Sequence, residues 1–404
     1  MFFDLIVVGG GAAGFFSAIT CAETSGKSVL ILEKTSNVLQ KVKISGGGRC
    51  NVTHDCFEPR ELTGHYPRGG KALLGPFHRF NAADTVDWFT HRGVSLKTEA
   101  DGRMFPETDD SQTIIDTLMN AATAAGVEVR TGRGVDSIVP SGDRFDVGTD
   151  AGHTYTARSV LIATGGTRSS AGAKLASDLG HDLQPATPSL FTFKIKDPRL
   201  EGLLGLSVDP AHVKIAGSKL ESDGPVLITH WGLSGPGILK ISAWGARELA
   251  ERAYRFDVIV DWLPNVDVAA EIAERRQRDA KRQLSTRCPF PTIPKRLWSS
   301  LLAASGIADT TIWAELPKKQ ANRLVGQLSG CTFVVAGKST NKDEFVTCGG
   351  VSLDEIDFKT MESKLVPGLF FAGEVIDVDG VTGGFNFQNA WTNGFHAGSA
   401  IAAR

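Results

Sequence analysis

Six residues near the N-terminus have a spacing that suits phosphate binding. From Gly9 to Gly14 the sequence GGGAAG matches the pattern Gly-x-Gly-x-x-Gly. In such a turn Gly9 permits a tight bend, Gly11 lets the backbone approach a pyrophosphate, and Gly14 allows a helix to pack closely on a strand. A helix that begins there offers free N–H groups and a partial positive charge to the phosphates. The turn therefore predicts the binding of a dinucleotide.

The flanking segments have the character of the elements that such a turn needs. The apolar segments from Phe2 to Val8 and from Ser28 to Leu32 are typical of buried strands, and Ala12 to Ser25 is typical of a helix that ends at Gly26. Together they predict a βαβ unit with parallel strands. Glu33 follows the second strand, nineteen residues after Gly14, where an acid would accept hydrogen bonds from a ribose. A glycine-rich turn without a ligand would leave this acid unexplained.

Three further segments favour FAD as the dinucleotide. They are a second glycine-rich loop, KVKISGGGRCNVT (41–53), a strand that ends in small residues, LIATGG (161–166), and a strand before a glycine-rich loop and a long helix, LFFAGE (369–374). They are expected to surround an extended ligand, with its adenosine at Glu33 and its flavin near 373–387. The N-terminus of the last helix, expected over 387–403, would then stabilise the anionic reduced flavin.

These segments and their neighbours supply fourteen candidate cofactor contacts, and no metal site is expected. The candidates are Gly9, Gly11, Ala12, Ala13, Gly14, Glu33, Lys34, Lys41, Gly47, Val135, Thr164, Gly165, Gly373 and Asp377.

Four stretches resemble one bacterial family nearly from end to end. They are VVGGGAAG (7–14), KISGGGRCNVT (43–53), THWGLSGP (229–236) and TMESKLVPGLFFAGEVIDVDGVTGGFNFQNAW (360–391). The family is that of the NAD(P)/FAD-dependent, aminoacetone-oxidase-like oxidoreductases. The chain departs from it at Thr53-His54, where Thr-Asn is usual, and in a shorter segment over 167–172. The resemblance implies cofactor contacts at Ser45, Gly46, Arg49, Asn51, Glu374, Gly384, Phe385 and Asn386.

The pattern along the chain predicts an α/β protein with an insertion. The fold class expected is a Rossmann-like, glutathione-reductase-like FAD-binding domain, interrupted by an antiparallel β domain with a helical subdomain. The FAD-binding domain would cover 1–188 and 344–404, and the insertion 189–343. Short strands with Gly and Pro turns are expected from Phe191 to Ile241, and the helical subdomain over about 265–330.

Composition limits the partners and the location. The chain of 404 residues has 43 Lys and Arg against 45 Asp and Glu, a formal net charge of -2, which argues against nucleic acid and a membrane surface as partners. The basic run RRQRDAKR (275–282) is interpreted as a solvated helix face. No apolar stretch is long enough to span a bilayer, and no secretion signal is recognised, so a cytoplasmic protein is expected. The oligomeric state is left open.

The function expected is that of an FAD-dependent oxidoreductase acting on a small organic substrate by hydride transfer through a non-covalent flavin. The chain has no second dinucleotide fingerprint, so NAD(P)H would bind only transiently as donor; alternatively the substrate is the donor and dioxygen the acceptor. Cys50 and Cys56 have five residues between them, against four in flavin disulfide reductases, so a redox disulfide is not expected. His230 and Trp231 are weak catalytic candidates that could equally serve packing. The other alternative is a non-catalytic flavin-binding sensor or interaction protein.

Overall fold

The computed structural model describes residues 1–167, 171–339 and 346–404, and the contacts between its residues divide the chain into two units. The first unit comprises Met1–Pro188 and Lys342–Arg404, and the second comprises Ser189–Asn341. Part of the short segment 167–172 noted in the sequence lies outside the described residues.

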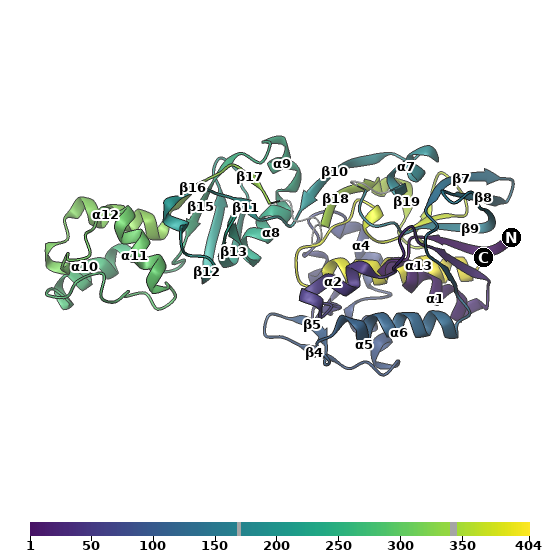
Figure 1. Cartoon of the computed structure of the whole chain (residues 1–404), viewed down its shortest axis with the longest axis horizontal. Helices are drawn as coiled ribbons and strands as arrows, with labels where there is room; N and C mark the ends of the chain where they lie inside the picture. The colour runs from purple at the N-terminus through teal and green to yellow at the C-terminus, as the bar shows by residue number, and fades with distance from the viewer. Residues whose placement is uncertain (168–170, 340–345) are drawn as a thin grey trace. The chain divides into compact units, whose positions relative to one another are not determined.

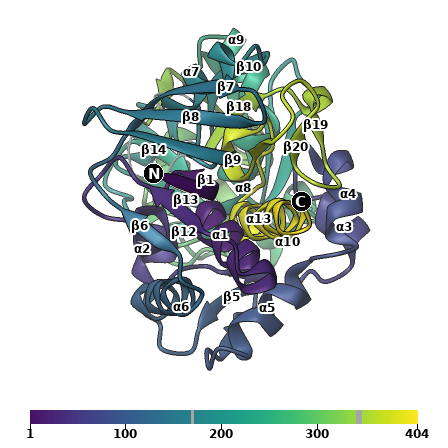
Figure 2. The same cartoon turned by 90° about the vertical axis from the view of Figure 1, so that its right-hand side faces the viewer.

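A largely parallel sheet forms the centre of the first unit (Figures 1 and 2). Its strand order is β19-β20-β21-β9-β1-β2-β6, and the pairs β21–β9, β9–β1, β1–β2 and β2–β6 are parallel. The antiparallel hairpin β7–β8 joins it through β9. The strands are β1 (Phe2–Val8), β2 (Val29–Leu32), β6 (Glu128–Arg130), β7 (Val135–Ser141), β8 (Arg144–Thr149), β9 (Thr154–Ile162), β19 (Ile356–Asp357), β20 (Glu362–Ser363) and β21 (Leu369–Phe371).

Two helices with small residues between them cover this sheet. Helix α1 (Ala12–Ser25) and the last helix, α13 (Phe385–Ala402), lie side by side, as Figure 2 shows. A Cβ atom on Gly394 would lie 2.9 Å from the carbonyl oxygen of Ala13, and one on Gly398 would lie 2.5 Å from that of Ser17. These glycines therefore let the two backbones approach closely, because any side chain would collide with α1.

The rest of the first unit consists of shorter elements. A loop was expected from Lys41 to Thr53, but its first part is helical: α2 spans Gln40–Gly48, with a break at Ser45 to Gly47. The reason is the buried Val42, which anchors the helix against the protein core. The further helices are α3 (Pro59–Thr63), α4 (Gly70–Phe77), α5 (Ala82–Thr90), α6 (Ser111–Ala124) and α7 (Ala171–Asp178), and the further strands are β3 (Thr53–His54), β4 (Leu96–Thr98), β5 (Arg103–Pro106), β10 (Leu183–Ser189) and β18 (Val346–Val351).

The second unit contains an antiparallel sheet of the order β16-β15-β12-β13-β14-β11-β17. Its strands are β11 (Phe193–Lys194), β12 (Ser207–Ile215), β13 (Glu221–Thr229), β14 (Gly232–Ser234), β15 (Phe256–Asp261), β16 (Cys331–Val335) and β17 (Gly337–Lys338). The expectation of strands up to Ile241 was wrong at its end, since α8 (Pro236–Trp244) follows β14 and α9 (Ala246–Glu251) comes next. The turn at Gly235 and Pro236 starts this helix, whose buried Ile238 and Ile241 are three residues apart.

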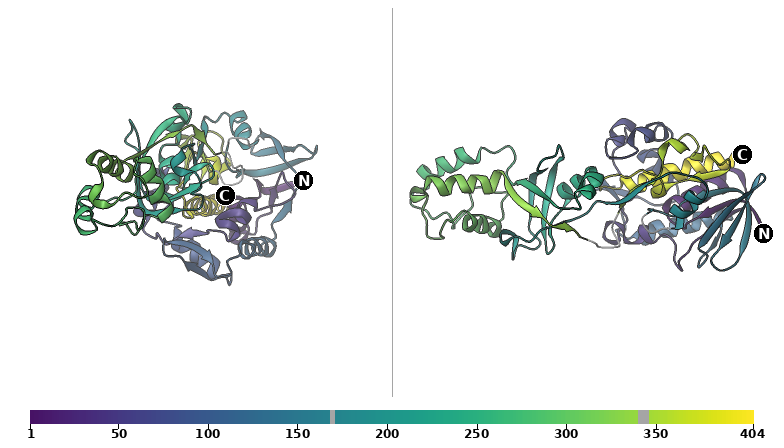
Figure 3. Two further views of the ribbon diagram at one scale, coloured as in Figure 1. Left: turned by 60° about the vertical axis from the view of Figure 1, so that its left-hand side comes forward. Right: turned by 90° about the horizontal axis from the view of Figure 1, so that it is seen from above.

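Three helices of the second unit pack around tryptophans. They are α10 (Val268–Arg278), α11 (Lys295–Ala304) and α12 (Lys318–Ser329), which gather at one end of this unit in Figures 1 and 3. Trp298 is fully buried and donates from Nε1 to the carbonyl oxygen of Leu284 at 2.9 Å. The expected fold class, an α/β domain with an inserted antiparallel sheet and helical part, is thus confirmed.

Candidate functional site

The glycine turn at the end of β1 has two glycines that the fold requires and one that it does not. Gly9 has a φ of +113°, and a Cβ there would lie 2.5 Å from the carbonyl oxygen of Ala163. A Cβ on Gly14 would lie 2.1 Å from the carbonyl oxygen of Gly9, so the close packing predicted for it is observed. Gly11 has an ordinary φ of −96°, and a Cβ there would meet no atom of another segment within 4 Å. The protein leaves this backbone open, which fits the approach of a pyrophosphate predicted there.

Glu33 is fixed at the end of β2, beside this turn. Its Oε2 accepts a hydrogen bond from the amide of Gly10 at 2.8 Å, and its Oε1 accepts from the amide and the hydroxyl of Thr35, each at 2.8 Å. A carboxylate can accept about four hydrogen bonds, so Oε2 keeps capacity for a ribose hydroxyl. Lys34 is exposed. Val135 is buried at the start of β7, and the amide of nearby Arg133 donates to the carbonyl oxygen of Glu33 at 2.9 Å.

The glycine-rich break in α2 approaches the start of α13. Gly46, Gly47 and Gly48 have φ values of +57°, +71° and +88°, a conformation that disfavours side chains. Asn51, with its amide oriented to satisfy its neighbours, accepts from the amide of Gly384 at 2.9 Å. A Cβ on Gly384 would lie 2.5 Å from the carbonyl oxygen of Thr53. The segment around Asn51 and the start of α13 are more than three hundred residues apart in the sequence, and they are therefore in direct contact in the structure.

Several side chains predicted to contact the cofactor bind the protein instead. Arg49 forms an ion pair with Glu99 at 2.6 Å and lies over the ring of Phe105, 4.0 Å from its centre. Asn386 accepts from the amide of Gly380 and donates to its carbonyl oxygen, both at 2.9 Å. The hydroxyl of Ser45 donates to the carbonyl oxygen of Val42 at 3.0 Å. Their side chains shape the loops and keep further hydrogen-bonding capacity, so their role as cofactor contacts stays a prediction.

Three other predicted residues converge from separate segments. Lys41 of α2 forms an ion pair with Glu374, whose other oxygen accepts from the amide of Thr347 at 2.7 Å. A Cβ on Gly165 would lie 4.0 Å from Nζ of Lys41. The neighbouring hydroxyl of Thr164 is buried and has no hydrogen-bond partner within 1–167, 171–339 and 346–404. A buried hydroxyl without a partner is costly, so this group fits a position where a polar ligand binds.

Two further predicted contacts, Gly373 and Asp377, follow strand β21 and differ in their surroundings. Gly373 has a φ of +77°, and a Cβ there would lie 3.0 Å from Cβ of Ala13 at the start of α1. Asp377 is 6% exposed, and its amide donates to the carbonyl oxygen of Val351 at 3.1 Å. Gly373 thus lies beside the start of α1, next to the glycine turn, whereas Asp377 is covered by the fold.

A cluster of rings at the N-terminus of α13 was not predicted from the sequence. The ring of Phe385 stacks on His65 with centres 4.1 Å apart and on His54 with centres 4.7 Å apart. The Nε2 of His54 lies 3.1 Å from the carbonyl oxygen of Asp101. Tyr66 donates to the carbonyl oxygen of Phe385 at 2.6 Å. The change from Thr-Asn to Thr53-His54 was the one signal in the sequence, and no pattern connected it with His65.

A buried ion pair between Arg68 and Asp379 lies close in the sequence to two rings of this cluster, His65 and Phe385. Arg68 donates from Nε to Oδ1 of Asp379 at 2.6 Å, and a second contact joins its Nη2 to Oδ2. The side chain of Asp379 is fully buried. The amide of Val381 also donates to the carbonyl oxygen of His65 at 2.9 Å. These contacts hold the segments 65–69 and 378–385 together, and they place His65 beside the N-terminus of α13.

The cysteines carry little reactivity. Burial raises the pKa of Cys50 to about 12, and burial, with nearby Glu61 and Asp55 adding to it, raises the pKa of Cys56 to about 11. All six cysteines of the chain lie within the described residues and are free thiols there. In the same ranges no three His, Cys, Asp or Glu side chains gather as metal ligands.

His230 and Trp231 lie in the second unit, at the turn between β13 and β14. Their ring centres are 4.6 Å apart, and 43% of the surface of Trp231 is exposed. Nζ of Lys194 lies 5.8 Å from the centre of the indole ring. Their role in catalysis stays a prediction.

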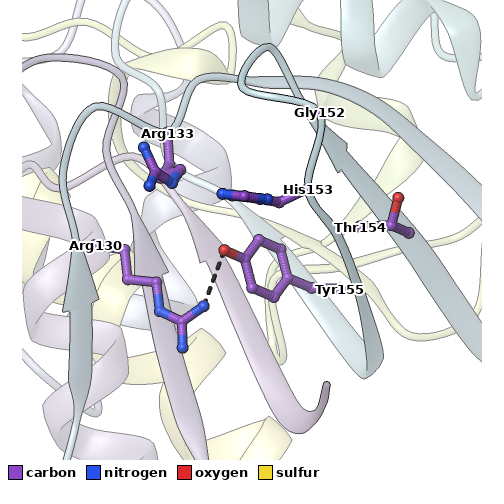
Figure 4. A pocket seen from close by; sticks show the side chains of 6 residues that line it. All are labelled: Arg130, Arg133, Gly152, His153, Thr154 and Tyr155. Carbon is purple, nitrogen blue, oxygen red and sulfur yellow. Dashed lines mark hydrogen bonds between the residues drawn. The ribbon is translucent and has the colours of Figure 1, made fainter.

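An open hollow of about 480 Å³ lies near Glu33, because the backbones of two residues that line it, Arg130 and Arg133, form hydrogen bonds with the backbone of Glu33 (Figure 4). It is lined by Arg130, Arg133, Gly152, His153, Thr154 and Tyr155. Arg130 donates to the hydroxyl of Tyr155 at 2.9 Å and pairs with Glu128 at 2.6 Å, so its charge is already compensated. None of the predicted cofactor contacts lines this hollow.

Comparison with known protein families identifies the family of the chain. Residues 3–400 match the family described as the HI0933-like protein Rossmann domain. The chain belongs to this family. The Rossmann domain that the family description names corresponds to the parallel sheet and helices of the first unit.

Two full-length relatives with different names are similar to the chain. A 3-dehydro-bile acid delta(4,6)-reductase of Clostridium scindens is 29% identical over 415 residues, covering 98% of each protein. A ribosomal RNA dihydrouridine synthase of Escherichia coli is 30% identical over 411 residues, covering 99% of this chain and 98% of the relative. A 3-ketosteroid-delta4-(5alpha)-dehydrogenase of Rhodococcus jostii has a similar fold, with a TM-score of 0.54 at 16% identity over 100% of this chain and 97% of that chain.

In the described ranges no helix is both long enough and apolar enough to cross a membrane.

Proposed function

We propose that the chain is an FAD-dependent reductase that saturates a carbon–carbon double bond conjugated to a carbonyl group. The observation that carries this proposal is the match over the whole chain to two relatives whose names describe the same chemistry. A 3-oxo steroid with double bonds at positions 4 and 6 contains such a bond, and so does uracil, which becomes dihydrouracil. The narrower likeness to aminoacetone oxidases, with dioxygen as acceptor, has no comparable support and remains a prediction.

The residues of the first unit fit FAD. The open backbone at Gly11 and the N-terminus of α1 suit a pyrophosphate, and Glu33 suits a ribose. The unsatisfied hydroxyl of Thr164, within the described residues, and the N-terminus of α13 suit the flavin end of the ligand. FAD would supply the transfer of two electrons as hydride, which side chains alone cannot perform.

The residues around α13 would position the substrate and supply a proton. In the overall reaction one carbon of the double bond gains a hydride and the other gains a proton, while NAD(P)H is the proposed source of the two electrons. His54 and His65 lie beside Phe385 and carry imidazole groups, a type of side chain that serves as a general acid in many enzymes. Donation to the carbonyl oxygen would further stabilise the negative charge that develops on it.

NAD(P)H is proposed to bind transiently. The chain has a single Gly-x-Gly-x-x-Gly segment in the position required after a strand, and this proposal gives that segment to FAD. A nicotinamide donor would therefore make few contacts and leave before the substrate binds.

The test compares reductase, oxidase and non-catalytic flavin binding in one series. The purified holoprotein is mixed anaerobically with NADH, NADPH or a panel of amines, and the loss of flavin absorbance is followed by stopped flow. The reduced protein is then mixed with a 3-oxo-4,6-diene steroid acid, with uridine-containing RNA, and with a saturated steroid as matched control. Reoxidation by an unsaturated compound, with formation of its saturated product, supports the proposal. Reduction by amines and reoxidation by dioxygen alone would replace it by the oxidase function, and no reduction by any donor would leave a flavin-binding protein.

A further inference from the structure

The net charge of the whole chain conceals two oppositely charged parts. Residues 189–341 contain 21 Lys and Arg against 15 Asp and Glu, a formal charge of +6. The rest of the chain contains 22 Lys and Arg against 30 Asp and Glu, a formal charge of −8. The net charge of -2, which argued against nucleic acid, therefore averages two units that the structure separates.

The positive charge of the second unit is concentrated in its helical part. Residues 262–330, which contain α10, α11 and α12, have 11 Lys and Arg against 6 Asp and Glu, a formal charge of +5. These helices lie together at one end of the unit in Figure 3. We refer to residues 262–330 as the basic helical segment.

Ion pairs within the described residues of this segment involve three of its six acids and three of its eleven cations. In α10 and just after it, the three arginines Arg275, Arg278 and Arg282 form ion pairs with Glu271, Glu274 and Asp279. Within the described part of the chain, the other eight cations of the segment form no ion pair; they are Arg276, Lys281, Arg287, Lys295, Arg296, Lys318, Lys319 and Arg323. All but Arg276 are exposed. The excess positive charge therefore faces solvent.

The position of four of these cations is not explained by helix stability. Lys295 and Arg296 begin α11, and Lys318 and Lys319 begin α12, although a helix dipole repels cations at its N-terminus. Neither helix has a side-chain cap. Helix α10 follows the favourable pattern instead, with Asp267 as its cap and its arginines in the last turn. The four cations cost some helix stability, and together with the free amides they attract phosphate groups.

We propose that the basic helical segment binds the phosphate backbone of RNA, and that the substrate is a uridine within that RNA. This inference rests on the proposed function, because uracil contains the conjugated double bond that such a reductase saturates. Eight cations without an ion pair, all within the described residues, supply the sequence-independent attraction of a polyanion. The relative named ribosomal RNA dihydrouridine synthase, similar over its full length, supports RNA as the polyanion.

The experiment measures binding of the full-length holoprotein to deproteinised ribosomal RNA over a range of salt concentrations. The test variant replaces the four helix-start cations by glutamine: Lys295→Gln, Arg296→Gln, Lys318→Gln and Lys319→Gln. The matched control replaces four exposed cations of the first unit: Arg60→Gln, Lys71→Gln, Arg79→Gln and Arg158→Gln. Far-UV circular dichroism and flavin content check that each variant is folded.

We expect a specific change in salt dependence. If all four cations contact phosphates, the test variant binds RNA on the order of a hundredfold more weakly at low salt. A plot of the logarithm of the association constant against the logarithm of the salt concentration has a negative slope, and this slope becomes shallower by about 3 to 4. The control variant behaves like the parent protein. Equal binding by the test variant and the parent overturns the inference, as does binding to vesicles with anionic lipid but not to RNA. Reduction of a free enone is measured alongside for the parent protein. A parent protein that reduces the enone but does not bind RNA refutes this inference alone, and a parent protein that binds RNA but reduces nothing refutes the proposed function alone.

Discussion

At the scale of single residues, the carboxylate of Glu33 already accepts three hydrogen bonds from the protein. It is therefore held in place before a ribose binds, and a preorganised acceptor loses little entropy on binding. We expect Glu33→Ala to weaken the binding of FAD roughly tenfold to a hundredfold, because one charge-assisted hydrogen bond contributes about 1.5–3 kcal/mol. Titration of the apoprotein with FAD, followed by flavin fluorescence, measures this change. Glu33→Gln keeps one acceptor oxygen and should lie between the two; an unchanged affinity in Glu33→Ala would remove Glu33 from the site.

The thiols of Cys50 and Cys56 should not take part in the redox reaction. Burial raises the pKa of these groups to about 12 and about 11, so both are protonated thiols over the pH range in which enzymes are assayed. A thiolate is the reactive form of cysteine. Cys56→Ser should therefore leave the rate of flavin reduction within about twofold of the parent at neutral pH. A long-wavelength charge-transfer band on two-electron reduction, absent from Cys56→Ser, would show the opposite.

Contacts between residues far apart in the sequence could not be predicted at this scale. Gly9, Gly14 and Glu33 were assigned from local spacing, and the positions of the glycines follow from the backbone contacts that they make. The pairs Arg68–Asp379 and His65–Phe385 join segments more than three hundred residues apart. Their formation depends on the packing of α13, and one sequence carries no signal for such a contact. The cofactor role of Gly9, Gly14, Glu33 and Phe385 stays a prediction.

At the scale of elements, a Ser–His–Glu arrangement in the first unit ties three segments together. Nδ1 of His181 lies 2.8 Å from Oε2 of Glu355, and its Nε2 lies 3.0 Å from Oγ of Ser363. The geometry is that of a hydrolase triad, but Ser363 is 6% exposed, and its Oγ also accepts from the amides of Leu365 and Val366. A nucleophile needs an accessible oxygen, so this arrangement stabilises the edge of the sheet.

We expect His181→Ala to lower the free energy of unfolding by about 1–3 kcal/mol, because buried partners at Ser363 and Glu355 lose their hydrogen bonds. Urea denaturation measures the loss. His153→Ala, at an exposed position, is the matched control and should change stability by less than about 0.5 kcal/mol. Labelling of Ser363 by an active-site-directed fluorophosphonate would contradict the structural role.

Strong periodicity and caps explain which elements were predicted. The expected strand Phe2–Val8 and helix Ala12–Ser25 have the observed bounds, because buried apolar runs and the left-handed Gly26 define them. The helices of the segment 59–90 were not predicted, because they are short, and α4 begins at a glycine, Gly70, which is a poor helix former. For α5 a signal existed, since Asn81 and Asp84 form a capping box.

At the scale of the whole molecule, we expect NAD(P)H and the organic acceptor to bind at the flavin one after the other. A transient NAD(P)H without a domain of its own would bind at the flavin face that the substrate also needs, and this gives ping-pong kinetics. Initial rates with varied NAD(P)H at several fixed acceptor concentrations should give parallel double-reciprocal lines, with inhibition at high acceptor concentration. Intersecting lines, together with tight binding of NADP⁺ in the presence of acceptor, would indicate a separate nicotinamide site.

The order in which the chain is synthesised gives the two-part first unit a further consequence. Strand β21 and helix α13 belong to the last part of the chain, whereas β9, which pairs with β21, and α1, which packs on α13, belong to the first part. The second unit is continuous and can fold while the ribosome is still translating. The flavin end of the proposed site is completed by residues 373–387, close to the C-terminus, so we expect flavin to be acquired after synthesis is complete. A ribosome-bound chain stalled before Leu369 should contain a folded second unit and no flavin.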